Sequence, residues 1–320
     1  MKVLITGGAG FIGSNFVRRV VDGTLGGITS VIILDNLTYA GSLENIPDLD
    51  TNDFKFVKGD ICDKDLVLKL TRECDAVINF AAESHVDRSI AFAGEFIRTN
   101  VVGTENLLSC SLKNEVSIFL QVSTDEVYGT IDSGSWTEDF PVMPNSPYSA
   151  SKASADLIVR SYFKTYGMDI RITRCSNNYG PYQYPEKVIP LFITNILQDK
   201  KIPLYGNGEN VRDWLHVDDH CFGIEKVLTH GVAGNIYNIG GGRELKNIDL
   251  ARTVLNYFGK DESWIEWVPD RPGHDYRYSV NYNKAEKDLG YKPQVAFEEG
   301  ISKVISWYES NPKWWLARKK

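Results

Sequence analysis

The chain has 320 residues, of which 42% are hydrophobic and 24% charged, a composition typical of a globular protein with one large domain or two unequal ones. Its 42 acidic residues outnumber its 35 lysines and arginines, and the net charge of −7 argues against a surface that neutralises a nucleic-acid backbone. The five cysteines are widely spread and contain no C-x-x-C pair, which predicts free thiols in a reducing compartment and no structural zinc site.

The beginning of the sequence predicts a soluble, cytoplasmic protein. The apolar run 1–5 is followed at once by Thr6 and two glycines, so it ends before the hydrophobic core of a signal peptide could form. No later apolar run approaches the length of a membrane-spanning helix. We therefore expect no contact with a membrane.

Short β-rich runs alternate with helical patterns through the first half of the chain. The strand candidates are residues 3–6, 31–35, 54–57, 76–80, 118–123 and 170–173. The helix candidates are residues 11–21, 64–73, 92–112, with a possible break at Gly103, and 149–166. This alternation predicts an α/β fold with a doubly wound parallel (Rossmann) sheet.

After Arg174 the pattern changes to shorter elements separated by segments rich in aromatic residues, proline and glycine. A helical pattern at 218–228 and a strand pattern at 236–239 could return to the main sheet. We therefore predict two domains. Residues 1–175, with 217–239 returning to them, would bind a dinucleotide, and a smaller C-terminal domain of 176–216 and 240–320 would bind the substrate.

A glycine-rich turn follows the first predicted strand and precedes the first predicted helix. Its sequence is GGAGFIGS, residues 7–14, and two overlapping glycine spacings fit a dinucleotide-binding turn. Gly10 would let the backbone approach a pyrophosphate, and Gly13 would let helix and strand pack closely. The helix N-terminus would supply N–H donors for the negative charge.

An acidic residue ends the second predicted strand. Asp35 lies 22 residues after Gly13, where a carboxylate can accept hydrogen bonds from the adenosine ribose. It favours NAD over NADP, because a 2′-phosphate would meet like charge and residues 36–38 contain no arginine. Asp60 and Ile61, after the third strand, could flank the adenine or form a plain turn.

Candidate catalytic residues follow the fifth strand. Tyr148 and Lys152 are one helical turn apart, where the ammonium group is expected to lower the pKa of the phenol, although an isolated pair of this kind could also lie on a surface. Asp125 and Glu126 are adjacent carboxyl groups in a loop at the end of a central strand. They could serve as a protonated acid and an ionised base, or form an ordinary polar loop with a helix cap.

Eight ordered segments together resemble a known family. They are GGAGFIGS (7–14), DNLTYAGS (35–42), AAESHVDRSI (81–90), STDEVYG (123–129), PYSASK (147–152), SNNYGPYQYPEKVIPL (176–191), NVRDWLHVDDH (210–220) and DRPGHDYRY (270–278). The chain resembles the extended short-chain dehydrogenase/reductase superfamily and, within it, the dTDP-glucose 4,6-dehydratases. It departs from their usual pattern at Ser42, Tyr184 and the pair Gly242 and Arg243.

The resemblance implies an NAD-dependent lyase that converts dTDP-glucose to dTDP-4-keto-6-deoxyglucose and water, with bound NAD reduced and reoxidised in one turnover. Tyr148 would take the proton of the carbon 4 hydroxyl, helped by Lys152 and by a hydrogen bond from Thr124. Glu126 would remove the carbon 5 proton, and Asp125 would protonate the departing carbon 6 hydroxyl. The catalytic set is therefore Thr124, Asp125, Glu126, Tyr148 and Lys152.

The resemblance also implies two sets of binding residues. For the cofactor they are Gly7, Gly10, Phe11, Ile12, Gly13, Asp35, Asn36, Leu37, Thr38, Asp60, Ile61, Ala81, Ala82, Ser84, Thr99, Tyr148, Lys152 and Asn178. For the nucleotide sugar they are Ser84, Thr124, Asp125, Glu126, Asn177, Lys187, Val188, Pro203, Tyr205, Arg212, Asn247, Arg271 and His274. His85 could be a ligand contact or a loop histidine.

Three further expectations complete the interpretation. His216 and His220 have the spacing of metal ligands, but no third ligand is evident, so we expect no metal. Residues 92–112 and 149–166 resemble a helix pair that forms a four-helix interface in this superfamily, which implies a homodimer. The alternatives are another NAD-dependent dehydratase of the same superfamily, a nucleotide-sugar 4-epimerase of that superfamily, and a catalytically silent NAD-binding regulator. An epimerase would not need Asp125 and Glu126.

Overall fold

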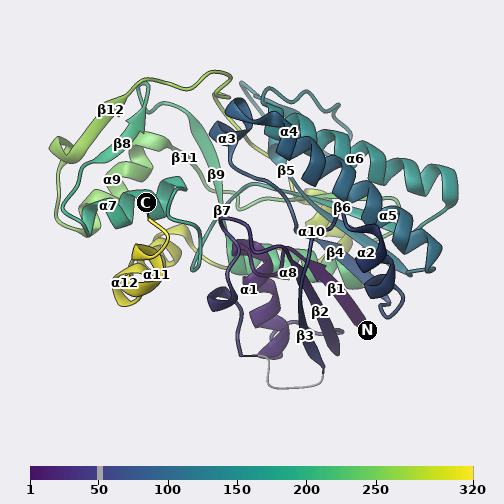
Figure 1. Ribbon diagram of the computed structural model, residues 1–320. Helices are drawn as coiled ribbons and strands as arrows, with labels where there is room; N and C mark the ends of the chain where they lie inside the picture. The colour runs from purple at the N-terminus through teal and green to yellow at the C-terminus, as the bar shows by residue number, and fades with distance from the viewer. Residues whose placement is uncertain (49–52, 320) are drawn as a thin grey trace.

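In the computed structural model, which describes residues 1–48 and 53–319, seven strands form one parallel sheet (Figure 1). Its order is β10-β6-β5-β4-β1-β2-β3. The bounds are β1 Lys2–Thr6, β2 Ser30–Asp35, β3 Phe54–Lys58, β4 Ala76–Asn79, β5 Ile118–Thr124, β6 Ile170–Cys175 and β10 Ile236–Ile239. The chain runs outward from β1 in one direction and from β4 in the other, so their carboxyl ends flank the point at which ligands bind in such sheets.

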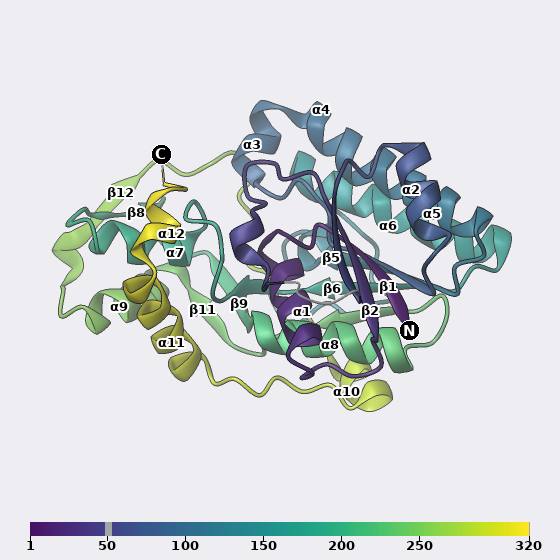
Figure 2. The ribbon, with the colours of Figure 1, turned by 60° about the horizontal axis from the view of Figure 1, so that its bottom comes forward.

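Helices cover both faces of this sheet (Figure 2). Alternate side chains of each strand point to opposite faces, so Val3 and Ile5 belong to one core while Leu4 belongs to the other. One helical layer contains α1 Phe11–Val21, α8 Val217–His230 and α10 Asn283–Leu289. The other contains α2 Lys64–Thr71, α5 Thr104–Lys113 and α6 Pro147–Tyr166.

The doubly wound α/β fold predicted from the sequence is confirmed. The six predicted strands of the first half are present with ends shifted by at most two residues, and all pair in parallel. Residues 236–239 form β10 beside β6, and α8 packs on the same sheet. The division of the chain into two functional domains stays a prediction.

The helix predicted over residues 92–112 has a different form. The structure has α3 Val86–Ala91 and α4 Ala93–Phe96, then a π-helical segment, Ile97–Gly103, that continues into α5. Gly103 therefore does not break the helix. A Cβ there would lie 2.5 Å from Cδ1 of Ile61, so glycine permits close packing. Wide turns of this kind are frequent at functional sites.

The π-helical segment positions one buried asparagine. Asn100 accepts a hydrogen bond from the backbone N–H of Glu83 at 2.9 Å and donates to the carbonyl of the same residue at 3.0 Å. Its amide also donates to the hydroxyl of Ser151 at 2.8 Å. The segment thus holds the loop after β4 and the first turns of α6 together.

A smaller lobe lies beside the main sheet, at the left of Figure 1. The sequence predicted shorter elements here without assigning them. The strands are β7 Asn177–Tyr179, β9 Val211–His216 and β11 Glu244–Lys246 in one sheet, and β8 Ile202–Tyr205 with β12 Ile265–Val268 in another. The helices are α7 Val188–Ile196, α9 Asn247–Tyr257, α11 Phe297–Ser310 and α12 Pro312–Leu316. Among residues 1–48 and 53–319, no helix combines the length and apolar character needed to cross a membrane.

Candidate active site

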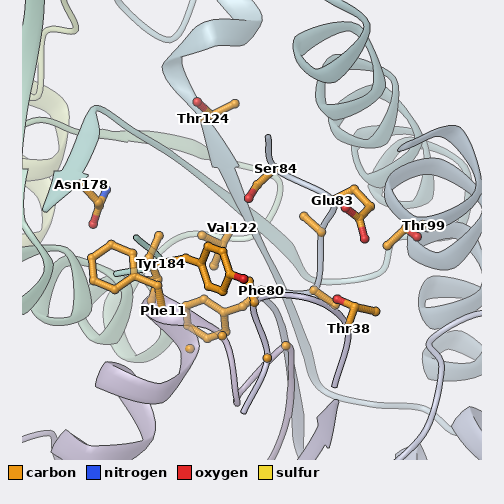
Figure 3. Close-up of a pocket in the computed structure, with 18 of the residues that line it drawn as sticks. Phe11, Thr38, Phe80, Glu83, Ser84, Thr99, Val122, Thr124, Asn178 and Tyr184 are labelled. Carbon is orange, nitrogen blue, oxygen red and sulfur yellow. The ribbon is translucent and has the colours of Figure 1, made fainter. Parts of the chain in front are cut away.

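A cavity of about 320 Å³ lies at the carboxyl ends of the central strands. Figure 3 shows Thr38 and Thr99 toward one end and Thr124 and Asn178 toward the other. Its wall is drawn from the glycine turn, the ends of β2, β4 and β5, the start of α6 and the segment from the end of β6 through β7. Widely separated parts of the chain therefore meet at one site.

Close packing requires the glycines of the turn after β1. Gly7 has φ +67°, and a Cβ there would lie 2.6 Å from the backbone nitrogen of Ala81. A Cβ at Gly13 would lie 2.3 Å from the carbonyl oxygen of Gly7. Gly10 precedes α1 without any side-chain cap, so the N–H groups of the first helical turn remain at the cavity wall. This arrangement fits a diphosphate.

Asp35 lies at the wall beside this turn and is 8% exposed. Its carboxylate accepts hydrogen bonds from the N–H of Ala9 at 2.9 Å and of Leu37 at 2.7 Å. Burial raises the pKa of Asp35, while these two hydrogen bonds lower it. Each oxygen accepts only one of these bonds and keeps a further lone pair, which fits the ribose hydroxyls of an adenosine.

Most of the predicted cofactor contacts lie on the cavity wall. Leu37 is the exception, because it lies outside the wall and contributes through its backbone bond to Asp35. The predicted cofactor residues on the wall are Gly7, Gly10, Phe11, Ile12, Gly13, Asp35, Asn36, Thr38, Asp60, Ile61, Ala81, Ala82, Ser84, Thr99, Tyr148, Lys152 and Asn178.

Tyr148 and Lys152 also line the cavity, and both are buried. The expected lowering of the Tyr148 pKa is not what the structure shows. Burial raises this pKa well above its ordinary value, and the negative charge of Glu126 raises it further. The Lys152 ammonium donates instead to the carbonyl of Val122 at 2.8 Å, and burial lowers its own pKa.

The neighbouring carboxyl groups of Asp125 and Glu126 have different surroundings. Burial, followed by the charges of Glu126 and Asp213, raises the pKa of Asp125 well above its usual value. Its Oδ2 is buried without a hydrogen-bond partner in the part of the chain that the structure describes.

Glu126 is only half-buried by its surface exposure, and cations oppose the desolvation of its carboxyl group. Desolvation raises the pKa of Glu126, while the charges of Arg271, Arg212 and Lys187 lower it. The surroundings therefore favour a protonated Asp125 next to a Glu126 that ionises more readily, which is the pairing that an elimination needs.

Six of the thirteen predicted substrate contacts line the cavity, among them Ser84, Asn177 and Lys187. The Lys187 ammonium donates to the carbonyl of Ser84 at 2.9 Å. The other seven lie outside the cavity wall, on the smaller lobe and its loops: Val188, Pro203, Tyr205, Arg212, Asn247, Arg271 and His274.

Two of these outlying residues are linked to the main domain through Asp87 in α3. Nη1 of Arg271 lies 3.5 Å from one carboxylate oxygen of Asp87, and the hydroxyl of Tyr205 donates to the other at 3.4 Å. The charges of Arg271 and Arg212 also act on Glu126, although neither residue belongs to the cavity wall.

The wall residues that were not predicted as contacts include Tyr39, Glu83, Tyr184 and Glu186. The rings of Tyr39 and Tyr184 meet edge to face at 5.4 Å, and the Arg88 guanidinium lies 3.7 Å from the centre of the Tyr39 ring. Arg88 also pairs with Glu186 at 3.0 Å. All four lie in segments quoted for the resemblance, but nothing in those segments told which side chains face the cavity.

The two histidines with metal-like spacing have separate partners. His220 is buried with its pKa lowered to about 3, and its Nδ1 lies 2.9 Å from the amide oxygen of Asn178. Nδ1 of His216 accepts a hydrogen bond from the N–H of Asp218 at 3.2 Å and caps α8. The bond from His220 fixes the side chain of Asn178 at the cavity wall.

The chain is similar to known proteins over nearly its whole length. Residues 4–304 match the family described as GDP-mannose 4,6 dehydratase. A dTDP-glucose 4,6-dehydratase of Streptomyces antibioticus is 53% identical over 323 aligned residues, which cover 100% of this chain and 96% of the relative.

Solved structures are similar over the whole chain as well. The crystal structure of DesIV, a dTDP-glucose 4,6-dehydratase from Streptomyces venezuelae with NAD and TYD bound, has a TM-score of 0.98 at 54% identity, and the match covers 100% of both chains. A UDP-glucose 4-epimerase of Thermotoga maritima has a TM-score of 0.90 at 29% identity, covering 98% of this chain and 100% of that one.

Proposed function

The chain belongs to the family described as GDP-mannose 4,6 dehydratase, and from this premise we propose that it is an NAD-dependent hydro-lyase, a dTDP-glucose 4,6-dehydratase. Its substrate is dTDP-glucose, and its products are dTDP-4-keto-6-deoxyglucose and water. One observation supports this most directly: a buried acid and a more readily ionised carboxylate, Asp125 and Glu126, end a strand beside Tyr148 and Lys152.

The reaction explains why a lyase needs a redox cofactor. The C–H bond at carbon 5 of the sugar is far too weakly acidic for a side chain to break until carbon 4 is a ketone. Bound NAD accepts the hydrogen of carbon 4 with its electron pair and returns it to carbon 6 in the same turnover, so the cofactor is not consumed. The net change is the loss of one water.

Tyr148 is the base for the first step in this proposal. Its phenolate takes the proton of the carbon 4 hydroxyl, and the Thr124 hydroxyl lowers the high Tyr148 pKa in part by a hydrogen bond. Lys152, one helical turn further along α6, holds positive charge behind the site.

Elimination then requires one proton removed and one supplied. Glu126 takes the carbon 5 proton, because the cations around it oppose the desolvation that raises its pKa. Asp125 gives a proton to the carbon 6 hydroxyl, which leaves as water rather than as hydroxide. The acid and the base are adjacent in the chain, so both reach neighbouring atoms of one sugar.

The binding residues follow the two lobes. We assign the cofactor to residues 1–175 and 217–239 and the nucleotide sugar to 176–216 and 240–320, with residues of the cavity wall serving both. The cationic side chains of Lys187, Arg212 and Arg271 suit a diphosphate in an otherwise acidic protein. We also propose a cytoplasmic location, which the five free thiols support.

Purified protein is expected to turn over dTDP-glucose with no added NAD or with only traces of it, because the hydrogen taken from carbon 4 is returned within the site. Mass spectrometry of the product checks this by the loss of one water per sugar. A requirement for stoichiometric NAD, converted to NADH, would contradict the proposal. An isomer of unchanged mass would identify a 4-epimerase instead, and UDP-glucose in parallel measures the selectivity for thymidine.

We further propose a homodimer. The outer faces of α3 to α6 carry large apolar side chains that the single chain leaves in solvent. Phe92 is 73% exposed, and Ile97, Val102 and Leu157 are each more than 50% exposed. Phe92 lies between α3 and α4, Ile97 and Val102 lie in the π-helical segment, and Leu157 lies in α6. Packing one such face on its copy would bury them in a two-fold interface.

Leu157→Glu is expected to convert the dimer largely to monomer, because it places a charge in the centre of the proposed apolar interface. Sedimentation velocity at micromolar concentration measures the change. Trp267→Glu is the matched control, since Trp267 is exposed to a similar degree but lies on β12 of the smaller lobe. The proposal fails if the unmodified protein sediments only as a monomer or if both variants dissociate equally.

A further inference from the structure

The end of the chain contacts the nucleotide-binding side of the protein. Trp314, in α12, donates its indole N–H to the amide oxygen of Asn45 at 2.9 Å across 269 positions of sequence. Trp314 is 8% exposed and Asn45 is 1% exposed, so this bond is shielded from water. A shielded hydrogen bond between such distant segments constrains both of them.

A second side chain of the same segment contacts the same loop. The Arg318 guanidinium donates to the hydroxyl of Ser42 at 2.7 Å and pairs with Glu44 at 2.8 Å. It also donates to the carbonyl of Trp314 at 2.6 Å and lies 4.3 Å from the centre of the Trp314 ring. The arginine and the tryptophan therefore support each other, and together they hold residues 42–45.

Residues 42–45 in turn hold the glycine turn. The Asn45 amide donates to the carbonyl of Ala9 at 2.8 Å, and the N–H of Ser42 donates to the same carbonyl at 3.1 Å. The N–H of Ala9 donates to Asp35 at 2.9 Å. The N–H and the carbonyl of Ala9, the residue before Gly10, are thus both held by residues between the end of β2 and Asn45.

The smaller lobe anchors α12 in its place. The Trp314 ring meets Trp307 of α11 at 5.1 Å and Tyr182 at 5.7 Å, both nearly edge to face. Arg18 of α1 lies 4.1 Å from the centre of the Tyr182 ring and donates to the carbonyl of Asn45 at 2.8 Å. The route from α11 to the glycine turn is therefore continuous, and it lies outside the cavity wall.

We propose that Trp314 is a positioning residue that acts through Asn45 to hold the glycine turn in the form that binds NAD. This inference rests on the proposed NAD-dependent function. A turn fixed before binding spares the ligand the cost of ordering it. Loss of the indole N–H therefore weakens NAD binding from a position that touches neither the cofactor nor the substrate.

The chain offers a matched pair of variants for the test. Trp314→Phe removes the N–H that reaches Asn45, while Trp315→Phe removes an equally buried N–H that donates to the carbonyl of Tyr308 at 2.8 Å within the C-terminal segment. Equilibrium dialysis of NAD against cofactor-stripped protein gives the dissociation constant, and thermal unfolding gives the stability of each variant. We expect Trp314→Phe to raise the dissociation constant about fivefold, the scale of one hydrogen bond, and Trp315→Phe to leave it unchanged.

The outcomes separate this inference from the function on which it rests. The inference would be overturned if both variants lowered the melting temperature equally and Trp314→Phe left NAD affinity unchanged. It would also be overturned if both variants weakened NAD binding equally, because either result would show a merely structural role. Unmodified protein that does not bind NAD would overturn the proposed function instead. A cycle with Asn45→Ala adds a second readout: Trp314→Phe should have no further effect on NAD affinity in that background, and additive effects would contradict action through Asn45.

Discussion

Tyr148→Phe is expected to lower turnover of dTDP-glucose by about 10²- to 10⁴-fold, the usual scale of general base catalysis. The variant keeps the ring, which meets Phe96 at 6.3 Å, and loses only the hydroxyl whose phenolate we propose as the base for the carbon 4 proton. No NADH absorbance should appear with substrate, and no solvent deuterium should enter carbon 5. NADH absorbance and deuterium exchange both depend on the first oxidation. If either signal appeared at the normal rate in Tyr148→Phe, Tyr148 would not be the base for that step.

The pH dependence of the first step gives an independent check. Burial and Glu126 raise the pKa of Tyr148, and the phenolate is the reactive form, so the oxidation rate should rise as the pH rises toward that pKa. This rise should be lost in Tyr148→Phe. Tyr179→Phe is the matched control, because Tyr179 is also buried but lies outside the cavity wall, and it should keep the normal profile.

Glu126→Gln and Asp125→Asn are expected to stop the reaction at different points. Glu126→Gln leaves Tyr148 and Lys152 in place, so carbon 4 is still oxidised and NADH absorbance accumulates while carbon 5 exchange is lost. Asp125→Asn keeps the base but removes the proton donor, so water loss should slow by about 10²- to 10⁴-fold while exchange can continue. The raised pKa of Asp125 also predicts the direction of the pH dependence. The dehydration rate should decline as rising pH removes the proton from Asp125.

Rapid-scan absorbance and mass spectrometry in deuterated water distinguish these variants. Normal exchange in Glu126→Gln together with lost exchange in Asp125→Asn would require the two roles to be swapped. Normal dehydration in both variants would refute the dehydratase proposal itself. Thermal unfolding of each variant shows whether a loss of rate reflects chemistry or folding.

The main sheet was predictable because its strands carry their own signals. Runs such as 31–34 are buried on both faces and therefore uniformly apolar, and the glycines of the turn at Gly7 and Gly13 have no room for a side chain. The smaller lobe gave weaker signals. The pairing of β8 with β12 joins segments about 60 residues apart, and no local pattern specifies such a partner.

The sequence predicted which residues form the site better than it predicted the burial and contacts of their side chains. The sequence and the resemblance identified Asp125, Glu126, Tyr148 and Lys152, and all four line the cavity. The sign of the Tyr148 pKa shift was wrong, because helix spacing does not reveal burial or the carbonyl of Val122 that receives the lysine's bond. The contact between Trp314 and Asn45 was equally hidden, since tertiary packing alone joins them.

The π-helical segment Ile97–Gly103 fixes the register of the chain around it. Each residue of an α-helix advances by about 100° around the axis, so one residue removed from this segment would turn everything on one side of it by that angle relative to the other. Asn100 could then no longer face the peptide of residue 83 while Leu107 and Leu108 faced the sheet. Insertions and deletions in the π-helical segment should therefore disrupt the fold far more than substitutions there. A change of length further along α5 would not restore the position of Asn100 relative to the sheet.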